Sequence, residues 1–255
     1  GTEQSEWYAD LAFKQTLITE TEKNIYLSLK AKKEASHVFS DEERTLEAKK
    51  DEKKDEAIAL VRDTLSQDAQ ILIFENSRKN AEAAAIKLSN LIQPEPKAKA
   101  LSESILATGE SETCHRLASC VSRGVAFHHA GLLPEQRRLV EQGFRENRIK
   151  VIASTPTLAA GLNLPARRVL IKSYRRYEYG SGMVPIPVIE YRQMAGRAGR
   201  PGLDPYGESF LMAKDNSEML NLKERYIEGS PEEIWSKLAS ESALRTHILS
   251  TITAG

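Results

Sequence analysis

Several features are scarce or absent in this sequence of 255 residues, and each absence narrows the class of protein. Its two cysteines, Cys114 and Cys120, do not make a zinc site even with the neighbouring His115, so we expect free thiols in a reducing compartment and no metal centre. No apolar run approaches the roughly 20 residues of a membrane span, and the polar N-terminus lacks a secretory signal. These absences predict a soluble, cytoplasmic protein with no membrane partner.

An excess of charge of either sign is also absent. Thirty-six basic residues balance thirty-six acidic ones, while 40% of the residues are hydrophobic, enough for a buried core. Overall charge therefore does not indicate a polyanionic partner. A nucleic-acid-binding surface would have to be a local basic patch.

The first 56 residues differ in pattern from the rest of the chain. Residues 1–40 scatter apolar side chains among polar ones, compatible with an amphipathic helix, a linker, a remnant of a preceding domain, or sequence added to the natural chain. Residues 41–56 are almost all charged or small, which is typical of a solvated helix or a linker. Neither stretch contains a motif that indicates a chemical function.

From Ala57 on, short apolar runs bounded by turn residues alternate with helical periodicity. This alternation predicts βαβ units and a parallel sheet. Strands are expected at residues 71–74, 125–127, 151–153, 169–171 and 210–212. Ser77 is predicted to cap the helix after the first of these strands, and Pro134 to open another helix. Because ligands of such open sheets bind at the carboxyl ends of the strands, we expect the polar motifs to lie there.

The strongest motif is Gln-Met-Ala-Gly-Arg-Ala-Gly-Arg at residues 193–200. On a helical turn, Arg197 and Arg200 would project from the same face and point at one polyanion. Their planar, permanently charged guanidinium groups suit phosphate oxygens and could stabilise the charge that develops on a transferring phosphoryl group. The alternative is a surface helix with solvated arginines, which the specific Gln-x-x-Gly-Arg-x-Gly-Arg pattern disfavours.

Two loops that follow predicted strands can donate hydrogen bonds to phosphate. Residues 155–165 begin Thr-Pro-Thr and are predicted to open a short helix, whose hydroxyls and free amides are suitable donors. Ser77 and Arg78 follow the strand at 71–74 and have the same logic. For each loop the alternative is an ordinary capped turn.

His128 and His129 are adjacent and could be mistaken for a metal site. Neighbours on a strand point to opposite faces, so the two rings cannot ligate one ion without other ligands. One histidine is expected to pack in the sheet. His129, together with Gly131 at the strand end, is the better candidate for a nucleic-acid phosphate contact.

The segment 167–191 is the local basic patch that the net charge conceals. It contains Arg167, Arg168, Lys172, Arg175 and Arg176, together with four of the eight tyrosines. The Gly-Ser-Gly run at 180–182 between two β-prone stretches predicts a hairpin. Tyr177 and Tyr179 could stack on a base while Arg175 holds the backbone. The alternative is a plain surface hairpin.

Together these segments resemble the C-terminal motor-domain motifs of superfamily-two helicases in the Ski-like branch, and most closely the archaeal Holliday-junction-migration (Hjm) helicases. The resemblance covers roughly Asp41 to the C-terminus and is most specific over residues 126–202. It implies an α/β fold with a RecA-like parallel sheet flanked by helices, a β-hairpin insertion and a helical C-terminal extension. The implied domains are a second RecA-like motor domain at 41–222 and the start of a winged-helix domain at 223–255, with 1–40 unplaced.

The resemblance also implies roles for individual residues. The implied catalytic residues are Gln193, Arg197 and Arg200, with arginine-finger roles for the two arginines. The implied cofactor-binding residues are Gly161, Asn163 and Gly196. The implied nucleic-acid-binding residues are Ser77, Arg78, His129, Gly131, Thr155, Thr157, Arg175, Tyr177 and Tyr179. The hairpin between the two most specific motifs matches the strand-separating wedge of the family.

By the same resemblance, the chain is part of an ATP-dependent 3′-to-5′ DNA helicase that acts on single-stranded and forked or branched DNA in replication-coupled repair. ATP and Mg²⁺ would be bound jointly with a first RecA-like domain of the same polypeptide. The sequence has no Gly-x-x-x-x-Gly-Lys-Ser/Thr loop and no Asp-Glu-x-His box, so this chain alone is expected to be inactive. Two alternatives stay open: an RNA helicase of the same branch and a non-catalytic nucleic-acid-binding module.

Overall fold

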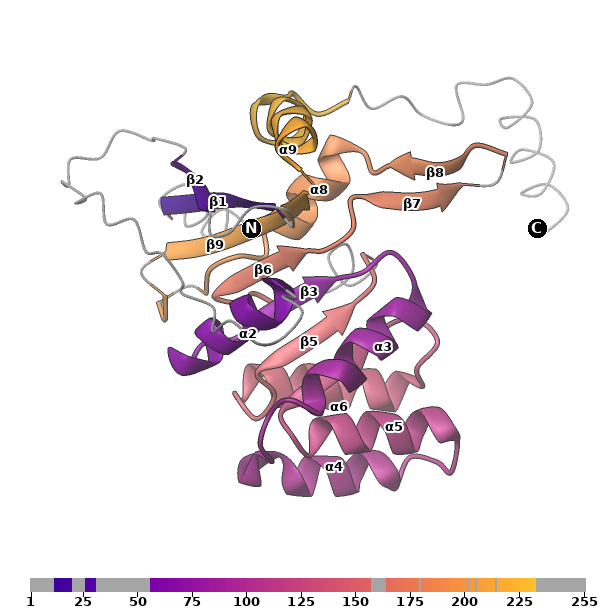
Figure 1. Cartoon of the computed structure of the whole chain (residues 1–255). Helices are drawn as coiled ribbons and strands as arrows, with labels where there is room; N and C mark the ends of the chain where they lie inside the picture. The colour runs from indigo at the N-terminus through magenta and orange to yellow at the C-terminus, as the bar shows by residue number, and fades with distance from the viewer. Residues whose placement is uncertain are drawn as a thin grey trace, which may run out of the picture.

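The described strands form one large sheet and one separate hairpin. The computed structural model describes residues 12–19, 26–30, 56–156, 164–178, 180–200, 202–204, 206–213 and 215–232. Within these residues the large sheet has seven strands in the order β2-β1-β9-β6-β3-β5-β4, and the hairpin is β7-β8 (Figure 1). Neighbouring strands of the large sheet are parallel, except that β2 pairs antiparallel with β1. The predicted α/β fold with a parallel sheet is confirmed.

The central strands are short and apolar. The strands are β1 (Ala12–Thr19), β2 (Tyr26–Lys30), β3 (Ile71–Phe74), β4 (Val125–His128), β5 (Val151–Ser154), β6 (Arg168–Ile171), β7 (Arg175–Glu178), β8 (Gly182–Pro185) and β9 (Tyr206–Ala213). Every residue of β3, β4, β5 and β6 is buried. Continuous apolar runs of this kind are typical of parallel strands covered on both faces, which is why these strands were predictable from sequence.

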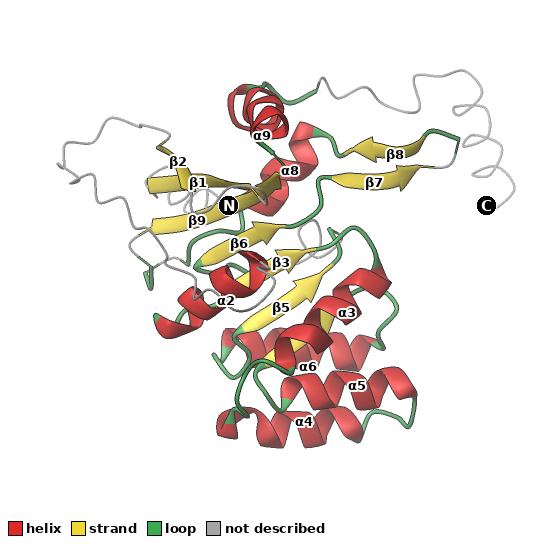
Figure 2. Ribbon diagram, in the orientation of Figure 1, coloured by secondary structure: helices red, strands yellow, loops and turns green. Residues whose placement is uncertain are grey.

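Helices connect the parallel strands (Figure 2). They are α2 (Glu56–Ser66), α3 (Arg78–Ser89), a 3-10 helix (Pro96–Ala98), α4 (Lys99–Leu106), α5 (Glu112–Val121), α6 (Pro134–Arg145), α8 (Val188–Ala195), α9 (Asn216–Leu222) and a π-helix (Lys223–Glu228). The Ser77 hydroxyl accepts a hydrogen bond from the Asn80 amide and caps α3, and Pro134 is the first residue of α6, as predicted.

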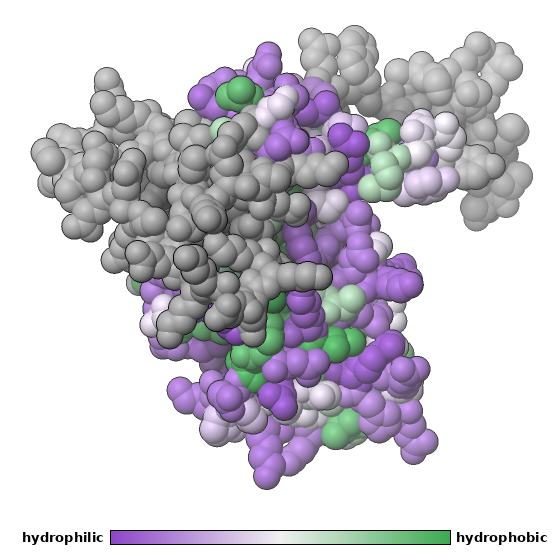
Figure 3. Space-filling view, in the orientation of Figure 1, coloured by the Kyte–Doolittle hydropathy of each residue, from purple (hydrophilic) through white to green (hydrophobic). Residues whose placement is uncertain are grey.

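The helices and the hairpin lie in two groups, one toward each edge of the large sheet. Helices α4, α5 and α6 lie at the β4 end of the order, beyond β5, whereas α8, α9 and the hairpin lie toward β9 (Figure 1). Buried aromatic side chains such as Phe74, Phe127 and Phe144 fill the core between helices and strands. Hydrophilic residues cover most of the visible helical surface (Figure 3). Among the described helices, none has the length and apolar character needed to cross a membrane.

The first thirty residues contain two strands that we did not predict. Strand β1 pairs in parallel with β9, with Ala12 opposite Tyr206, and β2 adds to the other side of β1. The amphipathic-helix interpretation of this segment is therefore wrong for β1 and β2. Strand β9 lies almost 200 residues from β1 in the sequence, so a non-local pairing joins this segment to the large sheet, and local periodicity does not record it.

The arginine motif is not wholly helical, contrary to our prediction. Helix α8 ends at Ala195 and Gly196 is its C-cap, so both arginines lie in the loop that follows. Gly199 has a φ of +99°, a conformation that glycine adopts readily, and Ala198 forms a β-bridge with Ala166. The loop therefore turns back onto the sheet instead of continuing the helix.

The domain boundaries proposed from the sequence stay predictions. The sheet includes β1 and β2, which precede residue 41. The expected winged-helix segment begins with the π-helix at Lys223–Glu228, and its remainder after Glu232 lies outside the described residues.

Candidate functional site

The parallel strands define a carboxyl end and an amino end of the sheet, and the predicted site residues divide between them. Ser77 ends the short loop after β3 and Arg78 begins α3, while Thr155 directly follows β5. The loop after β4, which contains His129 and Gly131, joins them because the Thr155 amide donates to the His128 carbonyl. The structure therefore brings three predicted nucleic-acid-binding loops together at the carboxyl end.

The arginine motif lies at the opposite, amino end. Ala198 pairs with Ala166, which precedes β6, and Arg200 Nη1 donates to Oε1 of Gln70, which precedes β3. The expectation that every polar motif lies at the carboxyl end is wrong for this motif. The chain leaves the hairpin at the carboxyl end, where the Ile186 amide meets the Tyr174 carbonyl, and α8 returns it to the amino end before the arginines occur.

His129 organises the loop after β4. Its Nδ1 accepts the Gly131 amide at 3.1 Å, so the neutral ring carries its proton on Nε2, which lies 3.1 Å from Glu82 Oε1. The ring is 3% exposed and stacks on Phe127. The other Glu82 oxygen pairs with Arg116 at 2.9 Å. Because both ring nitrogens have protein partners, the geometry favours an indirect role in which His129 fixes the loop.

Arg78 is brought against this loop. A Cβ added at Gly131 would lie 3.4 Å from Arg78 Nη1 and 3.0 Å from His129 Nδ1, so the glycine allows the close approach. The Ser77 hydroxyl accepts the Asn80 amide and keeps its own hydrogen for another acceptor. Ser77, Arg78 and the Gly131 loop thus form a compact group of donors that suits a phosphate.

Arg200 is held from two sides at the amino end. Its Nε and Nη2 donate to Asp204 Oδ2 and Oδ1, each at 2.8 Å, and its backbone amide donates to Oδ2 at 2.9 Å. The hydrogen bond with Asp204 raises the pKa of Arg200 above its usual value. Arg197 lies half-buried in the same loop and Gln193 is exposed on α8. One short segment therefore presents all three predicted catalytic residues.

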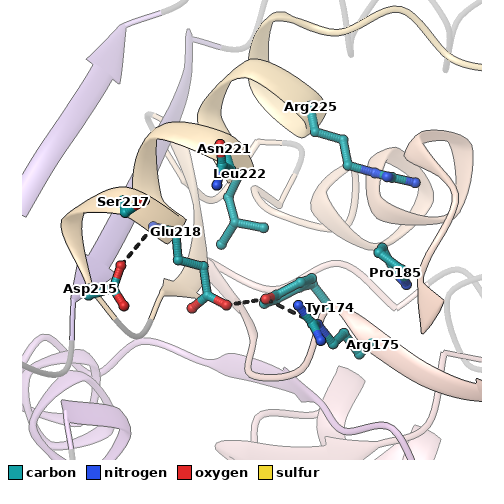
Figure 4. Close-up of a pocket in the computed structure, with 9 residues that line it drawn as sticks. All are labelled: Tyr174, Arg175, Pro185, Asp215, Ser217, Glu218, Asn221, Leu222 and Arg225. Carbon is teal, nitrogen blue, oxygen red and sulfur yellow. Dashed lines mark hydrogen bonds between the residues drawn. The ribbon is translucent and has the colours of Figure 1, made fainter. Parts of the chain in front are cut away.

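The β7-β8 hairpin has the predicted form and extends beyond the end of the sheet (Figure 1). Tyr177 pairs with Met183 across it, and these side chains are 71% and 49% exposed. At its base, Arg175 Nε donates to the Tyr174 hydroxyl, which also bonds the Glu218 carboxylate. A cavity of about 350 Å³ opens there (Figure 4).

The basic patch expected over 167–191 is wrong for Arg167 and Arg168. Both are 6% exposed, and both pair with Glu208. Arg168 also pairs with Asp63, a residue distant in sequence, so the tertiary fold neutralises charges that look exposed in the sequence. Arg175 remains at the hairpin base.

Some predicted site residues lie outside the described part of the chain, and some residues that support the site were not predicted. Thr157, Gly161, Asn163 and Tyr179 lie outside the described residues. Sequence reasoning missed Glu82, Gln70 and Asp204, which support the predicted residues. Glu82 and Gln70 are distant in sequence from their partners and gave no signal. Asp204, four residues after Arg200, is spaced to pair with it in a turn.

These features define the class of protein. Loops suited to phosphate at the carboxyl end of a parallel sheet accompany a Gln-x-x-Gly-Arg-x-Gly-Arg loop, and the chain belongs to the helicase conserved C-terminal domain family, which matches residues 52–202. The chain is similar to the ATP-dependent DNA helicase Hel308 of Methanocella arvoryzae, with 55% identity over 204 residues that cover 78% of this chain and 28% of that protein.

A second relative is similar over the same proportion. The ATP-dependent DNA helicase Hel308 of Pyrobaculum calidifontis is 48% identical over 209 residues, which cover 79% of this chain and 29% of that protein. The chain therefore spans less than a third of the length of these curated relatives. The predicted resemblance to archaeal DNA helicases is confirmed.

Proposed function

We propose that this chain is the second RecA-like motor domain of an ATP-dependent 3′-to-5′ DNA helicase that acts on forked or branched DNA in replication-coupled repair. The observation that carries the proposal is the guanidinium of Arg200, which Asp204 and Gln70 fix in the loop after α8 that also contains Arg197. Relatives named as ATP-dependent DNA helicases support DNA as the substrate. The direction and the preference for forks rest on the family resemblance.

ATP and Mg²⁺ would be bound jointly with a first motor domain of the same polypeptide. ATP supplies the phosphoryl group whose transfer to water drives movement. Arg197 and Arg200 would stabilise the negative charge that develops on that group, because fixed guanidinium forks match phosphate oxygens. Gln193 and Gly196 would lie at the same surface, and Gly161 and Asn163 would complete it.

The loops at the carboxyl end would hold the backbone of the translocating strand. Ser77 and Arg78 would supply hydrogen-bond donors, and His129, which accepts the Gly131 amide, would fix the neighbouring loop. Thr155 and Thr157 would extend this surface along the next loop. Contacts of this type bind phosphate and carry little base specificity.

The β7-β8 hairpin would separate the strands. Tyr177 is strongly exposed near its end, and Arg175 lies at its base. An exposed aromatic ring can stack on the last base pair, as Tyr179 would also do, while the arginine contacts the backbone.

The proposal is tested in a chimeric helicase in which the matched segment of this chain replaces the corresponding segment of the M. arvoryzae relative. We expect the chimeric helicase to hydrolyse ATP when single-stranded DNA is added and to unwind forked DNA that has a 3′ tail. The intact relative is the positive control. An RNA fork of the same sequence tests whether unwinding requires deoxyribose rather than ribose. Equal unwinding of the RNA fork would contradict the DNA assignment, and absence of DNA-stimulated ATPase would contradict the motor role.

A further inference from the structure

The contacts of Arg200 leave part of its guanidinium available to a ligand. Asp204 takes Nε–H and one N–H of Nη2, while Gln70 takes one N–H of Nη1. The inventory of arginine donors then leaves one N–H on each terminal nitrogen, as far as contacts within the described residues go. Two donors on separate terminal nitrogens match two oxygens of one phosphate. The Arg200 side chain is 17% exposed, so the group is held while still reaching the surface.

Gln70 cannot reverse its amide without losing two hydrogen bonds. Its Nε2 donates to the backbone carbonyls of Phe144 and Ile149, both at 2.7 Å, and the residue is only 3% exposed. These bonds direct Oε1 toward Arg200, which it meets at 2.9 Å. A buried amide tied to the main chain is a rigid support, because an unmade bond there leaves a buried polar group unsatisfied.

Asp204 supports the arginine from the other side. Its carboxylate is 5% exposed, and Oδ2 accepts both the backbone amide and Nε of Arg200. The bidentate contact therefore fixes the plane of the guanidinium relative to its own main chain. Together the two supports determine both the position and the orientation of the group.

We infer that Asp204 and Gln70 are positioning residues for Arg200 in ATP hydrolysis, holding its guanidinium with two N–H groups presented to a phosphate before the nucleotide arrives. This inference rests on the proposed motor function. Its physical basis is that a charged group fixed in advance does not need to reorganise when charge develops on the reacting phosphoryl group.

The first test measures, in the 255-residue chain without ATP, whether Asp204 holds the Arg200 guanidinium. With arginine labelled by ¹⁵N, we expect the Arg200 Nε–H resonance, assigned by its loss in Arg200→Lys, to be protected from exchange with water. Asp204→Asn should abolish this protection. Asp68→Asn is the matched control, because Asp68 is an acidic residue close enough to influence Arg200 electrostatically but pairs with Lys150. A resonance unchanged by Asp204→Asn would overturn the inference.

The second test measures ATP hydrolysis by the chimeric helicase. We expect Asp204→Asn to lower kcat by ~10- to 100-fold, the scale on which misplacement of a catalytic group acts, with little change in KM. Asp204→Glu should recover part of the loss, and Asp68→Asn should leave kcat unchanged. In an Arg200→Lys background, Asp204→Asn should add almost nothing, because it acts through Arg200.

The outcomes separate this inference from the proposed function. If the unmodified chimeric helicase hydrolysed no ATP, the proposed motor function would be contradicted. The exchange protection of the Arg200 Nε–H resonance would still show whether Asp204 holds the guanidinium. Wild-type kcat in a folded Asp204→Asn variant, or a full additional loss in the Arg200→Lys background, would overturn the positioning role. If Asp204→Asn unfolded at the assay temperature, Asp204→Glu would decide, since a misplaced carboxylate should lower kcat and an uninvolved one should not.

Discussion

At the scale of single residues, the two arginines of the loop after α8 have different surroundings. Arg200 is clamped by Asp204 and Gln70, whereas Arg197 lies half-buried one turn earlier in the same loop. Between them, Gly199 has a positive φ that bends the loop. The motif is therefore better described as a loop supported by the sheet than as a helix face.

We predict that Arg197→Ala or Arg200→Ala lowers ATP hydrolysis by the chimeric helicase by ~10³-fold or more, as expected for the loss of an arginine finger. Lysine should restore little activity, because an ammonium group lacks the planar fork. Steady-state ATPase assays measure the loss, and DNA-binding titrations check that the variants still bind the strand. Wild-type hydrolysis by Arg200→Lys would remove the finger role from Arg200.

The paired histidines predict how stability depends on pH. Burial lowers the pKa of His128 and of His129, although Glu141 and Glu82 act in the opposite direction. Since the folded pKa values lie below the unfolded value of about 6.5, the unfolded state binds more protons as the pH falls. The stability contribution should therefore be complete above about pH 6.5 and decline through the lower folded pKa values.

Urea unfolding midpoints between about pH 8 and pH 5 would measure this decline. A variant with His129→Asn should lose stability less steeply over this range than the wild type, whereas the exposed His115→Asn is the control and should keep the wild-type slope. A midpoint that rises toward acid pH would contradict the prediction.

At the scale of secondary-structure elements, Glu232, the last described residue, caps the first amides of α8. Both carboxylate oxygens of Glu232 lie 2.8 Å from the Val188 amide, and one also accepts from Ile189. Hydrogen bonds from these amides, first of all Val188, lower the pKa of Glu232. Arg192 of the same helix donates to the Gly229 carbonyl. The segment after the π-helix is thus tied to the helix that leads into the arginine loop.

We predict that Glu232→Ala lowers the free energy of unfolding by about 0.5–2 kcal/mol, the range found when a helix N-cap is removed. The reason is that the first amides of α8 lose their acceptor. Chemical denaturation of the 255-residue chain measures the change. Glu224→Ala, which removes an exposed acid from the neighbouring π-helix, is the control. Equal effects of both variants would show that the cap contributes nothing specific.

If the hairpin separates the strands, its removal should affect duplex unwinding but not DNA-stimulated ATP hydrolysis. Replacing residues 177–183 of the chimeric helicase with a short Gly-rich turn should leave DNA-stimulated ATPase near normal, because the arginine loop and the carboxyl-end loops lie outside the replaced stretch. Duplex unwinding should collapse, since each lost base stack removes roughly 1–3 kcal/mol that offsets unpairing.

Both hairpin assays need one preparation and one salt concentration, because backbone affinity falls with ionic strength. Glu103→Ala, which removes an exposed acid from α4, is a suitable control for the one charge, Glu178, that the replacement removes. Undiminished unwinding would remove the wedge role. Parallel loss of both activities would show that the hairpin supports the fold of the motor domain instead.

At the scale of the whole molecule, the candidate sites occupy opposite ends of one sheet. Donors for a nucleic-acid backbone gather at the carboxyl end, and the arginine loop lies at the amino end. The strands β3 and β6 connect the two ends through a rigid, fully buried core. The two candidate sites are therefore separated by the length of these strands.

We predict that the isolated 255-residue chain has no ATPase activity above background, with or without DNA. It supplies arginines, but its sequence has no loop of the type that cradles phosphates and positions Mg²⁺. A coupled ATPase assay on highly purified protein measures this, with Arg197→Ala as the control for a contaminating enzyme. Turnover that Arg197→Ala abolishes would contradict the prediction.

Features that depend on local pattern were predictable from residue order. Buried runs such as Ile71–Phe74 predicted the central strands, because fully covered parallel strands need continuous apolar residues. Ser77 and Pro134 predicted helix starts, and the Gly-Ser-Gly run predicted the hairpin, because these residue types favour particular backbone conformations. The family also followed from residue order alone.

Features that join distant segments became visible in the folded chain alone. It paired β1 with β9, buried Arg168 between Asp63 and Glu208, and gave both His129 nitrogens protein partners. It also placed the arginine loop at the amino end of the sheet, against Gln70, a residue 130 positions away. Such contacts form between residues that are far apart in the sequence. Side-chain type and local spacing therefore do not predict them.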